Sequence, residues 1–494
     1  MERDWATFGR DLHLELALRP APGARPRGLR TALTAALRDA VRDGRLAPGT
    51  RLPSSRSLAP DLGIARNTVA EAYADLVAEG WLTARQGSGT RVAEAPAPTR
   101  TTSSIGATPS RRTRPTPPRH DLTPGTPDLS AFPRSAWLAA ARRALTAAPN
   151  EALGYCPPGG HPALREALAD YLARARGVRT TPERVVVCAG FMQGLRAVAR
   201  VLRAAGVRAA GTEAYGLPFH RQTLLRTGLR TAPLAVDQKG AVTAELTGLR
   251  HLRTVLLTPA HQFPTGVALH PERRAEVVAW AREADGMVLE DDYDGEFRYD
   301  RQPVGALQGL APDRVVYLGT ASKSLAPGLR LAWLVVPERL LDPVLAAMGT
   351  PHELPLPGSD LLSGLGEGQA GTFDQLTLAE FLTSGAYDRH VRGMRLHYRR
   401  RRDRFVAAVR EHAPHLRVTG IAAGLHALLE LEPGTERSVV RGARWHGLTV
   451  TGLADFTAPG TVADRDALVV PYGRPPEHAF PQVLDALLRA LPPA

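Results

Sequence analysis

Gly-Thr-Ala-Ser-Lys-Ser-Leu-Ala-Pro-Gly-Leu-Arg, at residues 319–330, contains Lys323, one of only two lysines among the 62 basic residues of this chain. Arginine stays protonated, whereas a desolvated lysine can lose its proton and condense with an aldehyde. We therefore predict that Lys323 is a reactive amine that forms a Schiff base. Lys239, the other lysine, lies in the turn-like Asp-Gln-Lys-Gly. An arginine-biased composition can leave a lysine at such a position by chance, so Lys239 needs no functional explanation.

An acidic segment lies upstream of this lysine. Val-Leu-Glu-Asp-Asp-Tyr-Asp, residues 288–294, is an apolar run that ends in acids and a tyrosine, as at the carboxyl end of a buried strand. A pyridine cofactor needs a carboxylate at its ring nitrogen and a phenol at its ring oxygen, which we assign to Asp291 and Tyr293. In isolation such a segment is more often a solvated loop or an ion-pair site. Its order and spacing relative to Lys323 favour a cofactor site.

Donors for a phosphate follow the lysine. Arg330 is placed to clamp a phosphate through its fork of N–H groups. Hydroxyl groups are expected from Thr320, Ser322 and Ser324.

Short apolar strands alternate with longer helices from Asp121 onward, which predicts an α/β sheet. The expected strands and helices, in chain order, are residues 185–188, 194–205, 207–210, 219–227, 254–257, 273–284, 287–289 and 315–318. Ligands bind at the carboxyl ends of strands in such folds. There, Gly190, Phe191 and Met192 would offer backbone amides to a phosphate at a helix start.

The amino-terminal region has the pattern of a helix-turn-helix. Residues 52–76 contain two short helical patterns, with Ser54 as the expected cap of the first and Gly63 in the tight turn between them. The amino end of the second helix is expected to reach a major groove, while the first helix contacts the DNA backbone. The candidate residues are Arg66, Asn67 and Thr68 on the second helix and Arg56 on the first.

A candidate wing follows these helices. Residues 80–92 read as two short strands around a glycine turn. The residues expected to approach the minor groove are Arg85, Gly87, Ser88, Gly89 and Thr90. A plain helical cap on the larger domain is the competing interpretation, but it does not explain the Gly-Ser-Gly-Thr turn or the polar start of the second helix.

Residues 258–336, from Thr-Pro-Ala-His-Gln-Phe-Pro-Thr-Gly to Lys323 and Arg330, resemble fold-type I aminotransferases, and more narrowly the MocR subfamily of GntR-type transcription regulators. The resemblance covers nearly the whole chain. It implies a multidomain α/β protein with an amino-terminal winged helix-turn-helix and a pyridoxal 5'-phosphate domain. That domain would comprise a three-layer αβα large part and a small carboxy-terminal α/β part.

The same resemblance implies partners. It implies a homodimer in which Tyr155 reaches across to the cofactor phosphate of the other subunit. It also implies a double-stranded DNA operator, and pyridoxal phosphate or its adduct with an amino compound as the effector.

The expected domains are a winged helix at residues 1–93, a linker at 94–120 and an aminotransferase-like domain at 121–494. The linker is rich in Pro, Thr, Ser and Arg and nearly lacks residues that form cores. A small carboxy-terminal subdomain is expected at about residues 385–494.

Bulk composition limits the remaining possibilities. The formal net charge of +13 suits a polyanion partner, although arginine bias explains it equally well. Two cysteines, Cys156 and Cys188, are too few for a disulfide framework or a metal cluster. No apolar leader or membrane-spanning run is visible, so we predict a bacterial cytoplasmic protein that associates with the nucleoid when bound to DNA.

Departures from the aminotransferase pattern bear on activity. Gln262-Phe263 stands where many of these enzymes have the asparagine of Asn-Pro-Thr-Gly, and Leu217 stands where a tyrosine is usual. Only Arg465 and Arg474 lie near the position of the arginine that grips a substrate carboxylate. We therefore favour a transcription regulator that senses pyridoxal phosphate over an active aminotransferase with a regulatory DNA-binding head. A fold that no longer binds cofactor is a third, weaker hypothesis, since Lys323 is retained.

Overall fold

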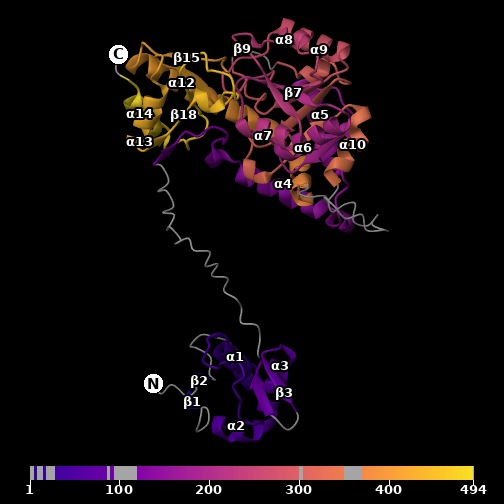
Figure 1. Cartoon of the computed structure of the whole chain (residues 1–494), viewed down its shortest axis with the longest axis vertical. Coiled ribbons are helices and arrows are strands. Elements are labelled where there is room, and N and C mark those ends of the chain that lie inside the picture. The colour runs from indigo at the N-terminus through magenta and orange to yellow at the C-terminus, as the bar shows by residue number, and fades with distance from the viewer. Residues whose placement is uncertain are drawn as a thin grey trace. The chain divides into compact units, whose positions relative to one another are not determined.

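A computed structural model describes residues 5–7, 15–17, 28–85, 89–93, 119–299, 304–349 and 370–492. The chain forms two compact units, residues 1–115 and 116–494 (Figure 1). Most of the predicted linker, residues 94–118, lies outside the described residues, as do Gly87 and Ser88 of the predicted wing.

The first unit contains a three-helix bundle and a two-stranded hairpin. Its elements are β1 (Trp5–Thr7), β2 (Glu15–Ala17), α1 (Leu29–Arg42), α2 (Ser55–Leu62), α3 (Arg66–Ala78), β3 (Leu82–Arg85) and β4 (Gly89–Val92). Ser54 caps α2 by accepting from the Ser57 amide at 3.2 Å, and Gly63 ends it with φ of 63°. Both local predictions are thereby confirmed. A small apolar core, including Leu37, Leu58 and Leu76, holds the three helices together.

The second unit is built on a seven-stranded sheet in the order β6-β14-β13-β12-β11-β7-β8. All neighbouring strands run parallel except β14, which is antiparallel to both β13 and β6. The elements from β5 to β14 are β5 (His120–Asp121), α4 (Arg134–Ala147), α5 (Pro162–Arg176), β6 (Val185–Cys188), α6 (Phe191–Ala204), β7 (Ala209–Glu213), α7 (Pro218–Arg226), β8 (Arg230–Leu234), β9 (Val236–Asp237), β10 (Gly240–Ala241), α8 (Glu245–Gly248), β11 (Thr254–Leu257), α9 (Pro271–Glu283), β12 (Met287–Asp292), β13 (Val315–Thr320) and β14 (Ala332–Val335).

Successive side chains of a strand point to opposite faces of the sheet, and this divides the core into two layers. On β6, Val185 and Val187 pack with α5 and α11 (Thr372–Thr383) on one face, whereas Val186 and Cys188 pack with α6 on the other. Because both faces are covered, strands such as β6 and β14 are continuous apolar runs instead of alternating ones. The predicted three-layer αβα architecture is confirmed.

The last part of the chain forms a smaller α/β assembly around the antiparallel sheet β15-β16-β19-β18. Its elements, with the helices that precede it, are α10 (Glu338–Gly349), α11, α12 (Ala386–His412), β15 (Arg417–Thr419), β16 (Ala427–Glu430), α13 (Glu436–Trp445), β17 (Leu448–Thr449), β18 (Thr451–Gly452), β19 (Ala467–Val470) and α14 (Phe480–Ala490). The first strand of the second unit, β5, pairs with β17, so His120 at the end of the predicted linker lies in a strand. Among the described helices, none is both long and apolar enough to cross a bilayer.

Candidate functional site

A pocket with a volume of about 220 Å³ opens where the carboxyl ends of β6, β7, β11, β12 and β13 meet. Ligands are expected at this edge of an open α/β sheet. The residues proposed from the sequence that line it are Gly190, Phe191, Met192, Asp291, Tyr293, Thr320, Ser322, Lys323 and Arg330. They come from four separate segments of the chain.

Lys323 lies in the turn after β13, with its amine inside the pocket. Its Nζ donates a hydrogen bond to the carbonyl of Gly125, in the loop after β5. Burial lowers the pKa of the Lys323 amine, and the nearby carboxylates of Asp291 and Asp294 partly oppose that shift. A larger fraction of this amine is therefore unprotonated than in a solvent-exposed lysine.

Asp291, at the end of β12, is 3% exposed, and its Oδ1 has no hydrogen-bond partner among the described residues. Burial raises the pKa of Asp291 well above its usual range, the adjacent Asp292 adds to the rise, and Lys323 opposes it. Its Oδ2 lies 3.7 Å from His220 Nδ1. Burial lowers the pKa of His220 to about 3, so this imidazole is neutral near pH 7. An unpartnered buried carboxylate oxygen fits a protonated ring nitrogen.

A cradle for an anion is formed by Gly190 and Arg330. Gly190 has a φ of 95° and directly precedes α6, whose first residues are Phe191 and Met192. A Cβ on Gly190 would lie 3.3 Å from the Arg330 Cζ, a tight contact, and the positive φ also favours glycine here. Amide groups at a helix start and a guanidinium together suit a phosphate.

Two hydroxyl groups extend this cradle. Thr320 Oγ1 donates to Ser322 Oγ at 2.8 Å and accepts from the Ser322 amide at 3.1 Å. Ser324 does not join them, contrary to the prediction. Its buried hydroxyl accepts a hydrogen bond from Tyr387 at 2.8 Å, because the turn after β13 directs this side chain towards α12.

Tyr293 directly follows β12 and lines the pocket, and its hydroxyl is 3.1 Å from His261 Nδ1. The same nitrogen is 2.8 Å from Asp294 Oδ2. Gln262, which replaces the usual asparagine, does not line the pocket; its amide donates to Tyr215 O at 2.9 Å and to Phe263 O at 2.6 Å. Gln262 therefore does not supply the hydrogen bond that the asparagine gives in those enzymes.

Tyr155 is 72% exposed and is not among the residues that line the pocket of its own chain. A role across a dimer stays a prediction. Leu217, at the position where tyrosine is usual, does line the pocket.

Cations that could hold a carboxylate are scarce around the pocket. Arg465 pairs with Glu430 at 3.1 Å, and Arg474 pairs with Asp121. Arg221 lines the pocket, but its guanidinium donates to three backbone carbonyls, of Gly216, Phe456 and Thr457. Within the described part of the chain, the remaining pocket cations are Lys323 and Arg330.

Sequence reasoning missed several pocket residues, among them Glu213, His220 and His426. Glu213 ends β7, so the rule that ligands bind at strand ends could have identified it. His220 lies in the first turn of α7 and His426 directly precedes β16, in segments without a polar pattern. Burial raises the pKa of Glu213 to about 7, while Thr258 and Gln262 donate hydrogen bonds to its carboxylate.

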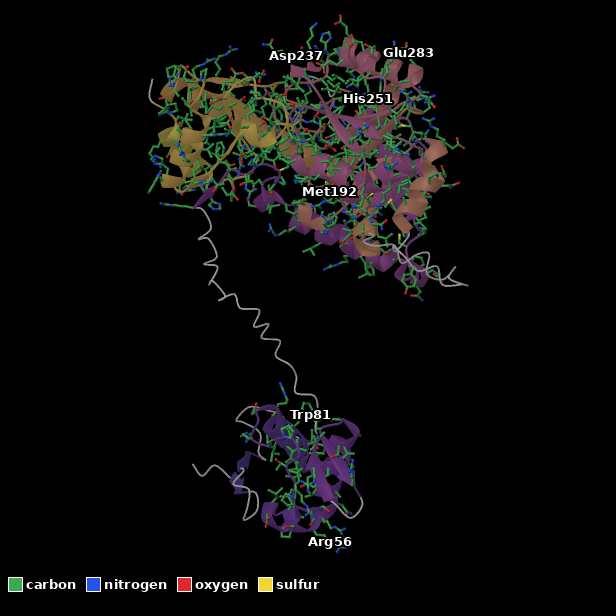
Figure 2. All side chains as sticks on the ribbon, viewed as in Figure 1. Arg56, Trp81, Met192, Asp237, His251 and Glu283 are labelled. Carbon is green, nitrogen blue, oxygen red and sulfur yellow. The ribbon has the colours of Figure 1, made fainter. Side chains whose placement is uncertain are left out.

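The first unit presents the residues proposed to contact DNA on its surface. Arg56 projects from α2 (Figure 2), and Arg66 and Asn67 are exposed at the start of α3. Thr68 is half-buried beside them. Ala65 precedes α3 without a side-chain cap, so the first amides of this helix are free of a capping side chain.

The hairpin that follows has the shape of the predicted wing. Strands β3 and β4 pair antiparallel over Leu82–Arg85 and Gly89–Val92, with Arg85 opposite Gly89. Arg85 is exposed, Gly89 has a φ of 81°, and Thr90 is half-buried.

Comparison with protein families gives two matches. Residues 29–92 match the family described as "Bacterial regulatory proteins, gntR family", and residues 121–462 match "Aminotransferase class I and II". An archaeal alanine:glyoxylate aminotransferase has the same fold, with a TM-score of 0.65 at 23% identity over 75% of this chain and 90% of that one.

Relatives of nearly full length are regulators. The HTH-type pyridoxine biosynthesis transcriptional regulator PdxR of Corynebacterium glutamicum is 34% identical over 95% of this chain and 97% of its own. The probable rhizopine catabolism regulatory protein MocR of Rhizobium meliloti is 34% identical over 85% of both chains. The protein therefore belongs to the MocR-type GntR transcription regulators, which join a GntR helix-turn-helix domain to an aminotransferase-like domain.

Proposed function

We propose that this regulator binds pyridoxal 5'-phosphate in the pocket, covalently at Lys323, and that occupancy of the pocket controls its binding to an operator. The observation that carries the proposal is the meeting of Lys323 with Asp291, a buried carboxylate with one unpartnered oxygen. Pyridoxal phosphate, when bound, supplies an aldehyde that condenses with amines and a pyridine ring that withdraws electrons.

Each part of the pocket has a role in this proposal. Lys323 provides the amine, and its lowered pKa favours the unprotonated form that can react. Asp291 would hold a proton on the ring nitrogen, and because His220 is neutral, that protonated ring nitrogen would be the counter-charge of the ionised carboxylate. The hydroxyl of Tyr293 would donate to the ring oxygen.

The cradle would hold the phosphate. Arg330 supplies a fixed positive charge, and the amides after Gly190 point from the start of α6. Thr320 and Ser322 would add hydroxyl donors. Tyr155 of one subunit would complete the phosphate site of the other, which requires a homodimer.

The scarcity of free cations favours sensing over turnover. Transamination requires a grip on the carboxylates of two successive substrates, an amino acid and then a keto acid. In the described residues around the pocket, Arg221 is already bonded to three carbonyls, and Arg465 and Arg474 are paired with acids elsewhere. We propose that the effector is pyridoxal phosphate or its adduct with an amino compound. It would bind as a signal and would not be converted in repeated catalytic cycles.

The winged helix would read the operator. Arg66, Asn67 and Thr68 would enter the major groove, and Arg56 would contact a phosphate. The wing residues proposed to approach the minor groove are Arg85, Gly87, Ser88, Gly89 and Thr90. A homodimer would present two such heads to two half-sites.

The two lysines offer a matched test of covalent binding. Lys323→Arg keeps the charge but removes the reactive amine, so the visible absorbance band of the lysine-bound cofactor should disappear. Lys239→Arg, which changes an exposed lysine near Glu272, should leave the band intact. A band that survives in Lys323→Arg would refute the proposal.

Two measurements separate regulation from catalysis. Added pyridoxal phosphate should change operator affinity in wild type but not in Lys323→Arg. With amino-acid and keto-acid pairs, multiple turnovers at ordinary enzymatic rates of about 1 s⁻¹ or more should not be seen. Turnover at such rates would favour the aminotransferase hypothesis.

A variant of the recognition helix tests the DNA contact. Arg66→Ala with Thr68→Ala should abolish an operator shift at moderate salt. The control Arg42→Ala changes an exposed arginine at the end of α1, and its operator affinity should stay close to that of wild type. Unchanged affinity in the double variant would show that α3 does not read the operator.

A further inference from the structure

The positive charge of the second unit is concentrated in one helix. Residues 116–494 carry 44 lysines and arginines against 38 acids. Helix α12 alone holds nine arginines and three acids, so the rest of this unit, with 35 of each sign, is neutral. General arginine bias does not account for such a distribution.

Of the nine arginines of α12, one is buried on the inner face, six are exposed, and Arg395 and Arg402 are half-buried. The inner face packs into the unit through Tyr387, Val391, Met394, Tyr398, Arg401, Phe405 and Val409. Arg401 is buried there and bonds Asp128 at 2.9 Å and Glu477 at 3.0 Å, so its role is structural. The exposed arginines are Arg389, Arg392, Arg399, Arg400, Arg404 and Arg410.

Acids neutralise little of this outer face. Among the described residues, the exposed arginines form one ion pair, between Arg399 and Asp403. Its N···O distance of 3.9 Å is at the upper limit for an ion pair. Arg389 donates only to the backbone carbonyl of Ser384, at 3.3 Å. Long exposed arginine side chains without close acids cost free energy through mutual repulsion, which a polyanion would relieve.

We propose that the outer face of α12, defined by Arg389, Arg392, Arg399 and Arg400, binds the phosphate backbone of duplex DNA that flanks the operator. Arg389 and Arg400 lie about 16 Å apart along the helix axis, a length over which a duplex presents many phosphates. A second copy of the chain is a poor occupant, because the same positive charges would face each other. The face also offers only one large exposed apolar side chain, Leu396.

The inference rests on the proposed function, because the winged helix would bring the duplex to this unit. The contact would be independent of sequence, as is usual for phosphate binding by arginine. It would lengthen the protected DNA beyond the half-sites and steepen the dependence of affinity on salt.

The test compares the full-length wild type with Arg389→Gln/Arg392→Gln/Arg399→Gln/Arg400→Gln. A control variant, Arg142→Gln/Arg226→Gln/Arg230→Gln/Arg250→Gln, removes the same charge from exposed arginines elsewhere on the second unit. The probe is the operator that wild type selects from a pool of random duplexes. It is used as a bare site and with flanks of about 30 random base pairs on each side, a length that supplies several phosphate contacts.

Wild type and control should gain affinity about tenfold or more from the flanks, whereas the α12 variant should gain little. The salt slope on the long duplex should fall in the α12 variant by up to ~0.9 for each phosphate that it no longer neutralises. An equal gain in both quadruple variants would overturn the inference. The inference would also be overturned if the α12 variant lost the same affinity for the bare site as for the flanked site. It would likewise be overturned if the exposed arginines of α12 bound phosphatidylglycerol vesicles but not the flanking DNA. Failure of wild type to select an operator would instead count against the proposed function.

Discussion

Asp291 and His220 both line the pocket, and their Oδ2 and Nδ1 atoms are 3.7 Å apart. Burial disfavours the charged form of both side chains, so the neutral imidazole offers no counter-charge that would favour ionisation of Asp291. Asp291 keeps its Oδ1 without a partner among the described residues. A positively charged ring nitrogen beside Asp291 would favour the ionised carboxylate and form an ion pair with it.

Asp291→Asn should weaken pyridoxal phosphate binding by roughly 10- to 100-fold, since a hydrogen bond to a charged group contributes about 1.5–3 kcal/mol. Absorbance titration of apo protein with pyridoxal phosphate measures the change. Asp237→Asn, which alters an exposed aspartate paired with Arg273, is the control and should bind like wild type. Equal affinity in both variants would remove Asp291 from the site.

Gly190→Ala should weaken phosphate recognition at least about tenfold, because the residue has positive φ and its new Cβ would crowd Arg330. Competition by inorganic phosphate against pyridoxal phosphate measures this effect apart from the lysine chemistry. Gly228→Ala imposes a similar strain, with φ of 86° and Arg203 beside it, but does not line the pocket. It should lower stability and leave the affinity for phosphate unchanged; a similar loss of affinity in both variants would mean that strain alone is responsible.

The order of strands explains which site residues could be predicted. Lys323, Asp291 and Gly190 each follow a strongly apolar run, and parallel strands bring such positions to one edge of the sheet. His220 and His426 reach the pocket from a helix and from the smaller assembly, whose positions depend on tertiary packing. Local patterns contain no information on that packing.

Side-chain direction was the harder part of the prediction. Thr320, Ser322 and Ser324 look equivalent in sequence, yet only the first two line the pocket, because the turn after β13 places Ser324 against Tyr387. The expected helix starts were one to three residues late, as for α6, which begins at Phe191. Tyr155 illustrates a further limit, since its predicted partner belongs to another chain.

A buried ion pair supports the strand that carries Asp291. Arg176 Nε donates to Asp292 Oδ2 at 2.7 Å, and Tyr317 donates to the same oxygen at 2.8 Å. Arg176→Met should reduce the free energy of unfolding by about 3–5 kcal/mol, because it leaves a buried charge unpaired. Arg174→Met, which breaks an exposed pair with Asp388, should cost less than ~1 kcal/mol. Denaturant titration measures both, and similar losses would contradict the argument.

Glu213 should make stability depend on pH. Its pKa in the folded protein is raised by burial to about 7, so the folded state retains a proton that the unfolded chain loses near pH 4.5. The stabilisation is therefore complete below pH 4.5 and is lost as pH rises through 7, by on the order of 3 kcal/mol. Glu213→Gln keeps an acceptor for Thr258 but cannot ionise, so its Tm should fall less than that of wild type between pH 5 and pH 8. Glu283→Gln, at an exposed position on α9, should follow wild type. If Glu213→Gln and wild type lose the same Tm over this range, Glu213 is not protonated in the folded protein at pH 5.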